Sequence, residues 1–410
     1  MATALPQSVR ADGSLSSATK SALNRRCAAS GAAYSRLLEA AAAMFLPQEL
    51  ERLAPRLHAA TSGGRTHPER LNGQGVQHLD PLSATEAMAY DFLAKGGKHS
   101  RPFITLAAYH ALAENVNVSG STTGGSAANV GDESKPIALP DAVKRCALSI
   151  ETFHKASLVH DDIEDNDEFR YGTPTLHRKY GTPTAINVGD YLIGLGYRLV
   201  SREAKSLGPE VVSDILDRIA DAHMKLSAGQ GAELLWRDSH NKQLTPQDTL
   251  RIYALKTAPA FEAALHTGLR LAGPAEHYLE PVGQFARNLG IAFQIINDQN
   301  DWLGDNHNKL LVAGDVIGGR PTLLWALALE GLAAGNRSEL ETLVSELPLS
   351  DEKLCEIRRL YEEAGAFQKA DRLVEKHQQR AEALAAEIEP EPLRRLFFHL
   401  IDMVLERRRS

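Results

Sequence analysis

The chain has 410 residues, of which 43% are hydrophobic and 24% are charged. This composition is typical of a globular protein that is large enough to bury an extensive core. The formal net charge of -7 excludes the basic field on which non-specific nucleic-acid binding depends. Nucleic acid is therefore not expected as a partner, and any anionic ligand must be held by local cations.

The cysteines and the N-terminal residues indicate the compartment. Cys27, Cys146 and Cys355 are far apart and form no CxxC pair, which favours a reducing compartment without structural disulfides. The first residues contain no apolar leader, and nowhere do 18 apolar residues follow one another. The sequence therefore predicts a cytoplasmic protein with no membrane span.

Composition divides the chain into regions. Residues 1–30 are rich in Ser, Ala and Thr without periodicity and are predicted to be a mobile N-terminal tail. Residues 31–80 begin with a helical pattern and end in a loop, so they form an N-terminal helical extension. Residues 81–410 form one long helical domain, interrupted at 115–136 by a Gly/Ser-rich insertion that we interpret as a surface loop.

Three long helical segments can be placed along this domain. One begins at Pro140 and Asp141, because proline followed by an acid is typical of a helix N-terminus. A second has Thr245 as its N-cap. A third covers 280–305, with apolar residues three and four positions apart. No series of alternating strands and no fixed-period repeat is found, so the fold class is predicted to be all-α.

The sequence "HDDIEDNDE" concentrates six acidic side chains within residues 161–168, a stretch that we call the first acidic segment. On a helix, Asp161 and Asp165 each lie about 20° from His154, so the three share one face. Carboxylates four residues apart repel each other, and carboxylate oxygens without nearby cysteine are typical ligands of Mg²⁺. Taken alone, the same pattern is also typical of a solvated acidic helix end.

A comparable stretch follows about 130 residues later. The sequence "NDQNDWLGD" places Asn297, Asp301 and Asp305 four residues apart, with Asp298 beside the first of them. We call residues 297–305 the second acidic segment. Two such helix faces opposite each other in a bundle are suited to hold several Mg²⁺ ions and a diphosphate between them.

Basic residues complete the pattern. "GGKHSRP" places Lys98 and Arg101 beside a flexible glycine pair, a compact anion site in an acidic protein. "YALKTAP" adds Lys256 and Thr257, and "GGRPT" adds Arg320. Each cation alone is typical of a protein surface, and it is their occurrence together with two acidic segments that indicates a diphosphate site.

The order GGKxxRP, HxxSLxHDDxxD, GQ, KT and FQxxxDxxD resembles that of the trans-isoprenyl diphosphate synthase (polyprenyl synthetase) family, over roughly residues 88–330. The resemblance is to synthases of the geranylgeranyl diphosphate type. It implies an all-α, isoprenoid synthase-type helical bundle around a deep central cavity, in a homodimer. It also implies condensation of isopentenyl diphosphate with an allylic prenyl diphosphate, with about three Mg²⁺ ions per site.

The resemblance assigns roles residue by residue. It implies metal binding by one set of residues: Asp161, Asp162, Asp165, Asn297, Asp298 and Asp301. It implies substrate binding by a second set: Lys98, Arg101, His154, Arg170, Lys256, Thr257, Gln294 and Arg320. Asp161, Asp162, Asp165, Arg170 and Lys256 are the residues expected to carry catalysis, by neutralising the diphosphate that leaves. Gln230, in "GQGAEL", is expected to support the site structurally.

Four positions depart from the family pattern. Tyr171 stands where the family usually has a second arginine, which removes one cation for isopentenyl diphosphate. Asn297 replaces an aspartate and removes one negative metal ligand. Arg320 replaces a lysine, which keeps the charge but changes the shape. The match of Lys309 to a family lysine is uncertain because the spacing after Asp301 is shortened.

The residues before Asp161 predict the length of the product. Bulky residues four and five positions before this aspartate limit the family to short products, and here Ser157 and Ala156 are small. Phe153 is the next bulky side chain, about one 5.4 Å turn deeper. This pattern favours a geranylgeranyl or somewhat longer product, although Phe153 is equally compatible with an ordinary core position.

Two other functions stay open at this stage. The spacing NDxxDxxxD is similar to a metal motif of class I terpene cyclases, although a cyclase has no use for a second anion site at Lys98 and Arg101. A non-catalytic subunit of a heteromeric prenyl synthase would account for Tyr171 and Asn297. The amphipathic C-terminal stretch is compatible with a final packed helix, with a membrane-surface helix or with a cover over the site.

Overall fold

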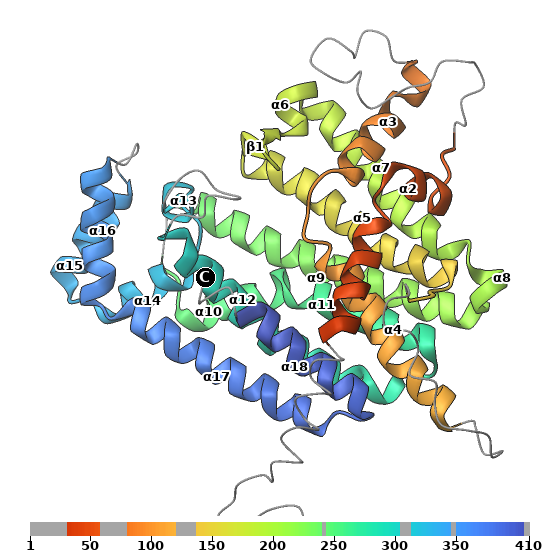
Figure 1. Cartoon of the computed structure of the whole chain (residues 1–410). Helices are drawn as coiled ribbons and strands as arrows, with labels where there is room; N and C mark the ends of the chain where they lie inside the picture. The colour runs from red at the N-terminus through yellow and green to blue at the C-terminus, as the bar shows by residue number, and fades with distance from the viewer. Residues whose placement is uncertain are drawn as a thin grey trace, which may run out of the picture.

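The computed structural model of the chain describes residues 31–57, 80–119, 137–239, 243–303, 313–345 and 350–405. Within these residues the regular structure is helical, apart from one antiparallel pair of two-residue strands, β1 (Phe169–Arg170) and β2 (Thr173–Pro174). The predicted all-α class is confirmed (Figure 1).

The helices follow one another in chain order, beginning with an unlabelled helix at 31–43. The others are α2 (Pro47–Leu53), α3 (Pro81–Ala94), α4 (Ser100–Ser119), α5 (Asp141–Glu164), α6 (Leu176–Tyr180), α7 (Thr182–Ser201), α8 (Ala204–Leu207), α9 (Pro209–Asp238), α10 (Pro246–Lys256), α11 (Ala258–Ala272), η3 (Glu276–Tyr278), α12 (Leu279–Asp301), α13 (Gly314–Ile317), α14 (Leu323–Gly331), α15 (Ala334–Ser345), α16 (Asp351–Glu363), α17 (Ala366–Glu387) and α18 (Glu391–Leu405).

Local sequence explains where the site-bearing helices begin. α5 has Pro140 as its N-cap residue and an acid, Asp141, in its first turn, as the sequence predicts. The Thr245 hydroxyl accepts a hydrogen bond from the backbone N–H of Asp248 and caps α10, which is also confirmed. The predicted single helix beyond it is interrupted at Thr257, where α10 ends and α11 begins.

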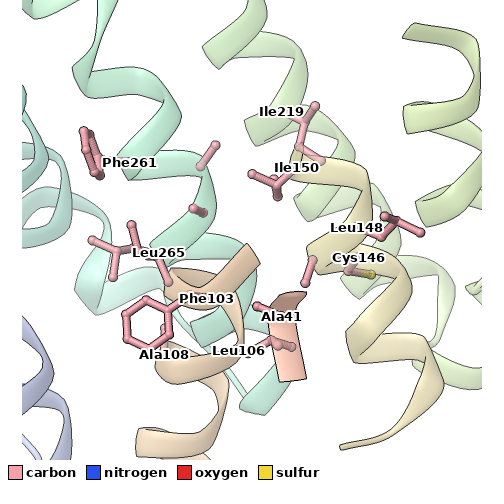
Figure 2. Close-up of a cluster of buried hydrophobic side chains, with 14 of the residues drawn as sticks. Ala41, Phe103, Leu106, Ala108, Cys146, Leu148, Ile150, Ile219, Phe261 and Leu265 are labelled. Atoms are coloured by element: carbon pink, nitrogen blue, oxygen red, sulfur yellow. The ribbon is translucent and has the colours of Figure 1, made fainter. Parts of the chain in front are cut away.

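One hydrophobic core joins the helices that carry the first acidic segment. α5 packs mainly against α7, and α4 packs mainly against α11. Buried side chains from α4, α5, α9 and α11 meet between them, and Ala41 of the N-terminal helix adds to the cluster (Figure 2). The N-terminal extension therefore belongs to the same core as the rest of the domain.

A second core cluster lies between α12, α14, α16 and α17, and it contains Tyr253, Trp302 and Tyr361. α18 runs along the first cluster and buries Leu393, Leu396, Phe397 and Leu400 there. The C-terminal stretch is thus a final packed helix up to Leu405, and residues 406–410 lie outside the described part.

Two predicted regions lie partly or wholly outside the described residues. The N-terminal tail, 1–30, is outside them, and so are residues 120–136 of the insertion. The first residues of the predicted insertion, 115–119, are the last turn of α4 rather than a loop. Among the described helices, none combines the length and the apolar character that crossing a bilayer requires.

Candidate active site

A cavity of about 320 Å³ lies beside the C-terminal half of α5, and α9 and α11 form much of its other walls. One part of its lining is polar: Arg101, His154, Asp161, Gln230 and Lys256. Another part is apolar: Ile150, Phe153, Ile193, Ile219 and Leu226. The structure therefore brings residues from four predicted motifs to one hollow that also has a hydrocarbon-like surface.

Asp161 and Glu164 are the carboxylates of the first acidic segment that line this cavity, and Asp161 is the one that the sequence predicts to bind metal. Burial raises its pKa to about 7, and the nearby carboxylates of Asp165 and Glu164 act in the same direction, whereas Lys256 opposes them. A carboxylate that is desolvated next to like charges is suited to receive a cation.

Asp162 and Asp165, the other two aspartates of this segment that the sequence predicts to bind metal, are paired with arginines. The buried Asp162 carboxylate accepts a hydrogen bond from Arg170 Nε at 2.8 Å and a second from its Nη2. Burial nevertheless raises the pKa of Asp162 to about 6, while Arg170 acts against this rise. Asp165 accepts from Arg237 Nη1 at 3.2 Å and from Arg320 Nη2 at 2.7 Å. Arg170 and Arg320 thus face the carboxylates that the sequence predicts to bind metal.

Glycines set several of the cavity side chains in place. A Cβ at Gly229 of α9 would lie 2.8 Å from the backbone N of Lys256, so only glycine permits this crossing of α9 and α10. Lys256 then reaches the cavity, where its ammonium lies 2.6 Å from a carboxylate oxygen of Glu233.

The apolar part of the cavity contains Phe153. Its ring packs on Gly196 of α7, where a Cβ would lie 2.7 Å from a ring carbon. It also meets Tyr197 edge-on, with the ring centroids 4.8 Å apart. Ser157 lines the cavity one turn nearer to Asp161, whereas Ala156 is buried and is not part of the lining. Of the three residues predicted to control product length, Phe153 and Ser157 therefore face the hollow.

The second acidic segment has different surroundings. The carboxylate of Asp298 is buried, accepts the hydroxyl of Tyr253 and accepts the backbone N–H of Leu323 at 3.1 Å. The carboxylate of Asp301 accepts the backbone N–H of Asp315 at 2.9 Å. Asn297 is half-buried, and Asp305 and Lys309 lie outside the described residues. None of the described residues of this segment lines the 320 Å³ cavity.

A guanidinium connects the two segments. Arg320 donates to Asp165 at 2.7 Å and to Asp315 at 3.0 Å, and the backbone of Asp315 is bonded to Asp301. Nearby, Thr257 donates to the side-chain oxygen of Gln294 at 3.2 Å. Lys98 is exposed, and neither it, Thr257 nor Gln294 lines the cavity.

The carboxylates of the first acidic segment are ligands of the kind that Mg²⁺ prefers. Asp161 and Asp165 supply the hard oxygen ligands that this ion prefers, and the raised pKa of Asp161 indicates an unmet need for positive charge. Within the described residues, however, no three His, Cys, Asp or Glu side chains converge as a metal site. The reason is that Asp162 and Asp165 are turned toward arginines. The chemistry of the residues fits Mg²⁺, and binding requires these ion pairs to open.

Several residues of this region are not predicted by the sequence. Arg237 and Glu233, which hold Asp165 and Lys256, follow the GQ motif on α9 in no recognisable pattern. Tyr253 gave no signal because its partner, Asp298, is 45 positions away in the chain. Lys155 follows His154 in the motif HxxSLxHDDxxD and was not predicted as a functional residue. The signal that could have identified it is a lysine between buried positions of a helix.

The structure is an all-α bundle, and its cavity has cations and carboxylates in one part and a hydrocarbon-like lining in another. This is the arrangement of an enzyme that transfers prenyl groups. A family model described as polyprenyl synthetase matches residues 83–363. A short chain isoprenyl diphosphate synthase of Methanothermobacter thermautotrophicus is 30% identical over 341 residues, 83% of this chain and 94% of that protein. The chain belongs to the polyprenyl synthetase family and is a prenyltransferase.

Solved structures agree on the fold. The geranylgeranyl pyrophosphate synthetase from Pyrococcus horikoshii aligns with a TM-score of 0.68 at 23% identity, over 91% of this chain and 98% of that one. The geranylgeranyl pyrophosphate synthase from Corynebacterium glutamicum, complexed with isoprenyl diphosphate and magnesium, aligns with a TM-score of 0.67 at 21% identity, over 83% and 96%. The expected isoprenoid synthase-type fold is thus confirmed.

Proposed function

We propose that the chain condenses isopentenyl diphosphate with an allylic prenyl diphosphate and releases a geranylgeranyl or somewhat longer diphosphate. The single observation that carries this proposal is the 320 Å³ cavity, whose lining joins Asp161, Lys256, Arg101 and His154 to an apolar part that contains Phe153. The name of the Methanothermobacter relative supports the same reaction class.

The polar lining has two groups of residues that suit two diphosphates. Asp161, Lys256 and, behind them, Arg170 surround the end of α5, where the allylic diphosphate is proposed to leave. His154 lies about two turns earlier on α5, Arg101 lies at the start of α4, and together they suit the diphosphate of isopentenyl diphosphate. Burial and the charges of Arg101, Lys155 and Arg170 hold the pKa of His154 well below its usual value, so its imidazole is neutral and binds by hydrogen bonding.

Magnesium is the proposed cofactor, with about three ions per site, because the donor chemistry fits and the Corynebacterium neighbour contains it. When bound, Mg²⁺ supplies positive charge to the leaving diphosphate. The proposed ligands are Asp161, Asp162, Asp165, Asn297, Asp298 and Asp301. Four of these carboxylates, Asp162, Asp165, Asp298 and Asp301, now accept hydrogen bonds from Arg170, Arg320, Tyr253 and Asp315, with which Mg²⁺ would compete.

The apolar wall protects the allylic cation from water and limits chain growth. Ile150, Phe153 and Ile219 offer no nucleophile, which preserves a carbocation. The growing tail is proposed to extend from Asp161 along α5 and to stop at the ring of Phe153. Ser157, which lies between them, leaves the path open.

A homodimer is proposed from the exposed face of α7 and α9. Met224 and Leu235 of α9 are 74% and 77% exposed, and Ile186 of α7 is 44% exposed. Ser227 and Gly231, on the same exposed face of α9, belong to the cavity lining, so a second copy on this face would also close the side of the cavity. A cytoplasmic location stays a prediction from the sequence.

One assay tests the reaction. The purified protein is incubated with Mg²⁺, labelled isopentenyl diphosphate and a five-, ten- or fifteen-carbon allylic diphosphate, and the products are separated by length. Diphosphates of twenty or more carbons are expected, with none when Mg²⁺ is chelated.

The other outcomes identify the alternatives. Released hydrocarbon or alcohol would identify a terpene cyclase, an alternative that the second anion-binding group, formed by Arg101 and the neutral His154, disfavours. No product alone, together with an altered product of a co-expressed synthase, would identify a non-catalytic subunit. Either result would reject the proposed function.

A further inference from the structure

Lys155 of α5 is a charged side chain in the interior of the protein. Its exposed fraction is 0%, and within the described residues no carboxylate forms an ion pair with it. Removing an ammonium from water without an ionic partner is costly, so such a residue is uncommon without a specific role.

The contacts of Lys155 point to one loop. Its ammonium donates to the backbone carbonyl of Gly96 at 3.0 Å and to that of Lys95. It also lies 4.2 Å from the ring centroid of Tyr171 and 5.4 Å from that of Phe92. These are neutral partners, so the positive charge is shared with them but is not cancelled.

The loop that receives this charge leads directly to the predicted anion site. Gly96 and Gly97 have φ values of 58° and 105°, which favour glycine, and Lys98 follows them. A Cβ at Gly97 would lie 3.7 Å from the Lys155 ammonium and 3.5 Å from a carboxyl oxygen of Glu151, whose pKa burial raises, which favours its neutral form; Gly97 itself is exposed. Only glycine backbone therefore separates the buried charge from the surface beside Lys98.

Tyr171 completes the arrangement. It occupies the first of two turn positions in the β1–β2 hairpin with a φ of 54°, a left-handed conformation that is unusual for tyrosine. Its ring covers Gly96 so closely that a Cβ there would lie 2.5 Å from a ring carbon. The position to which the family resemblance assigns an arginine is thus filled by a neutral ring, and the Lys155 ammonium lies 4.2 Å from the centroid of that ring.

We propose that Lys155 is a positioning residue of the isopentenyl diphosphate site. Lys155 fixes the Gly96–Gly97 loop and supplies, from the interior side of this loop, the positive charge that Tyr171 lacks. This inference rests on the proposed function. An anion bound beside Lys98 and Arg101 is stabilised by the ammonium across the glycine backbone, where the low dielectric strengthens the attraction. The allylic diphosphate, near Asp161, is expected to depend on it much less.

Substitution of Lys155 tests this division between substrates. Lys155→Met retains the length of the side chain and removes the charge. The dissociation constant of isopentenyl diphosphate, measured by calorimetry, is expected to rise at least about tenfold. The KM of the allylic substrate is expected to change less than about twofold, and Lys155→Met/Tyr171→Arg is expected to recover most of the lost affinity. The control is Lys144→Met, which removes another lysine of α5, about three turns from Lys155, and is expected to leave both values unchanged.

The wild-type protein provides a second test that does not depend on the folding of Lys155→Met. Burial lowers the pKa of Lys155 to about 8; Arg170 acts in the same direction and Glu151 opposes them. The other titratable groups that face it are His99, His154 and Tyr171, and the pKa shifts of all three keep them neutral between pH 7 and 9.5. Affinity for isopentenyl diphosphate is therefore expected to fall as the pH rises through 8 in wild type, and to fall less in Tyr171→Arg, whose added guanidinium stays charged throughout.

The outcomes are distinct. Equal weakening of both substrates by Lys155→Met, or no weakening, would reject the role of Lys155 while wild-type elongation still supports the proposed function. A wild-type protein that neither binds isopentenyl diphosphate nor elongates a primer would overturn the proposed function, and the role of Lys155 with it.

Discussion

The first and second acidic segments look alike in the sequence and differ in the structure. Asp161 of the first segment lines the cavity, and its pKa is raised to about 7. Asp298 of the second segment is bonded to Tyr253 and to the backbone of Leu323 within the interior. The spacing of acidic residues therefore identifies a helix end but not the direction in which each carboxylate points. We expect the two segments to respond differently to the same substitution.

The largest effect is expected from Asp161→Ala. Turnover should fall by at least about a thousandfold, because a proposed metal ligand in the cavity lining is lost and with it the charge stabilisation of the leaving group. The midpoint of thermal unfolding should stay unchanged or rise, because a desolvated carboxylate beside like charges is removed.

The matched control is Glu168→Ala, an exposed acid of the same segment, which should retain wild-type turnover. Unchanged turnover in Asp161→Ala would remove this residue from the metal site.

An effect on stability is expected from Asp298→Ala. The substitution leaves the buried Tyr253 hydroxyl and the Leu323 N–H without their carboxylate acceptor, which should lower the free energy of unfolding by about 3 kcal/mol. Denaturant titration measures this loss, and Asp161→Ala in parallel gives the contrast between the segments. Equal stability of the two variants would show that the surroundings of the segments do not differ in the way described.

The smallest expected change concerns product length, which should depend on α5 and not on α12. Phe153→Ala opens the apolar part of the cavity and should lengthen the main product by about one isoprene unit, a step comparable to the 5.4 Å pitch of a helical turn. Phe293→Ala removes an aromatic ring from α12, outside the cavity lining, and should leave the product distribution as in wild type. An identical distribution in Phe153→Ala would reject Phe153 as the limit.

Local signals in the sequence were sufficient for the fold and for part of the site. The start of α5 at Asp141 and the cap of Thr245 depend on neighbouring residues, and both were predicted. The common face of His154 and Asp161 follows from helical periodicity and is found in the cavity lining. Contacts between distant segments carry no such local signal.

The ion pairs of the site could not be predicted from the sequence. Arg320 was predicted to bind substrate, yet its pairing with Asp165, 155 positions away, depends on how α5 and the segment before α14 meet. The interruption at Thr257, in contrast, has a local cause, because Pro259 in the first turn of α11 has no backbone N–H with which to continue α10.

The glycines beneath the cavity side chains have a consequence for how this enzyme can vary. Gly196 receives the ring of Phe153, Gly229 the backbone of Lys256, and Gly189 the imidazole of His160, with a Cβ 2.3 Å from its Nε2. Each is a weak helix former in the middle of a helix, at a cost of about 1 kcal/mol relative to alanine. A single added methyl group at any of these glycines would displace the neighbouring side chain or backbone of the cavity while leaving every reactive side chain present. The shape of the cavity can therefore diverge through substitutions at residues that never touch a substrate.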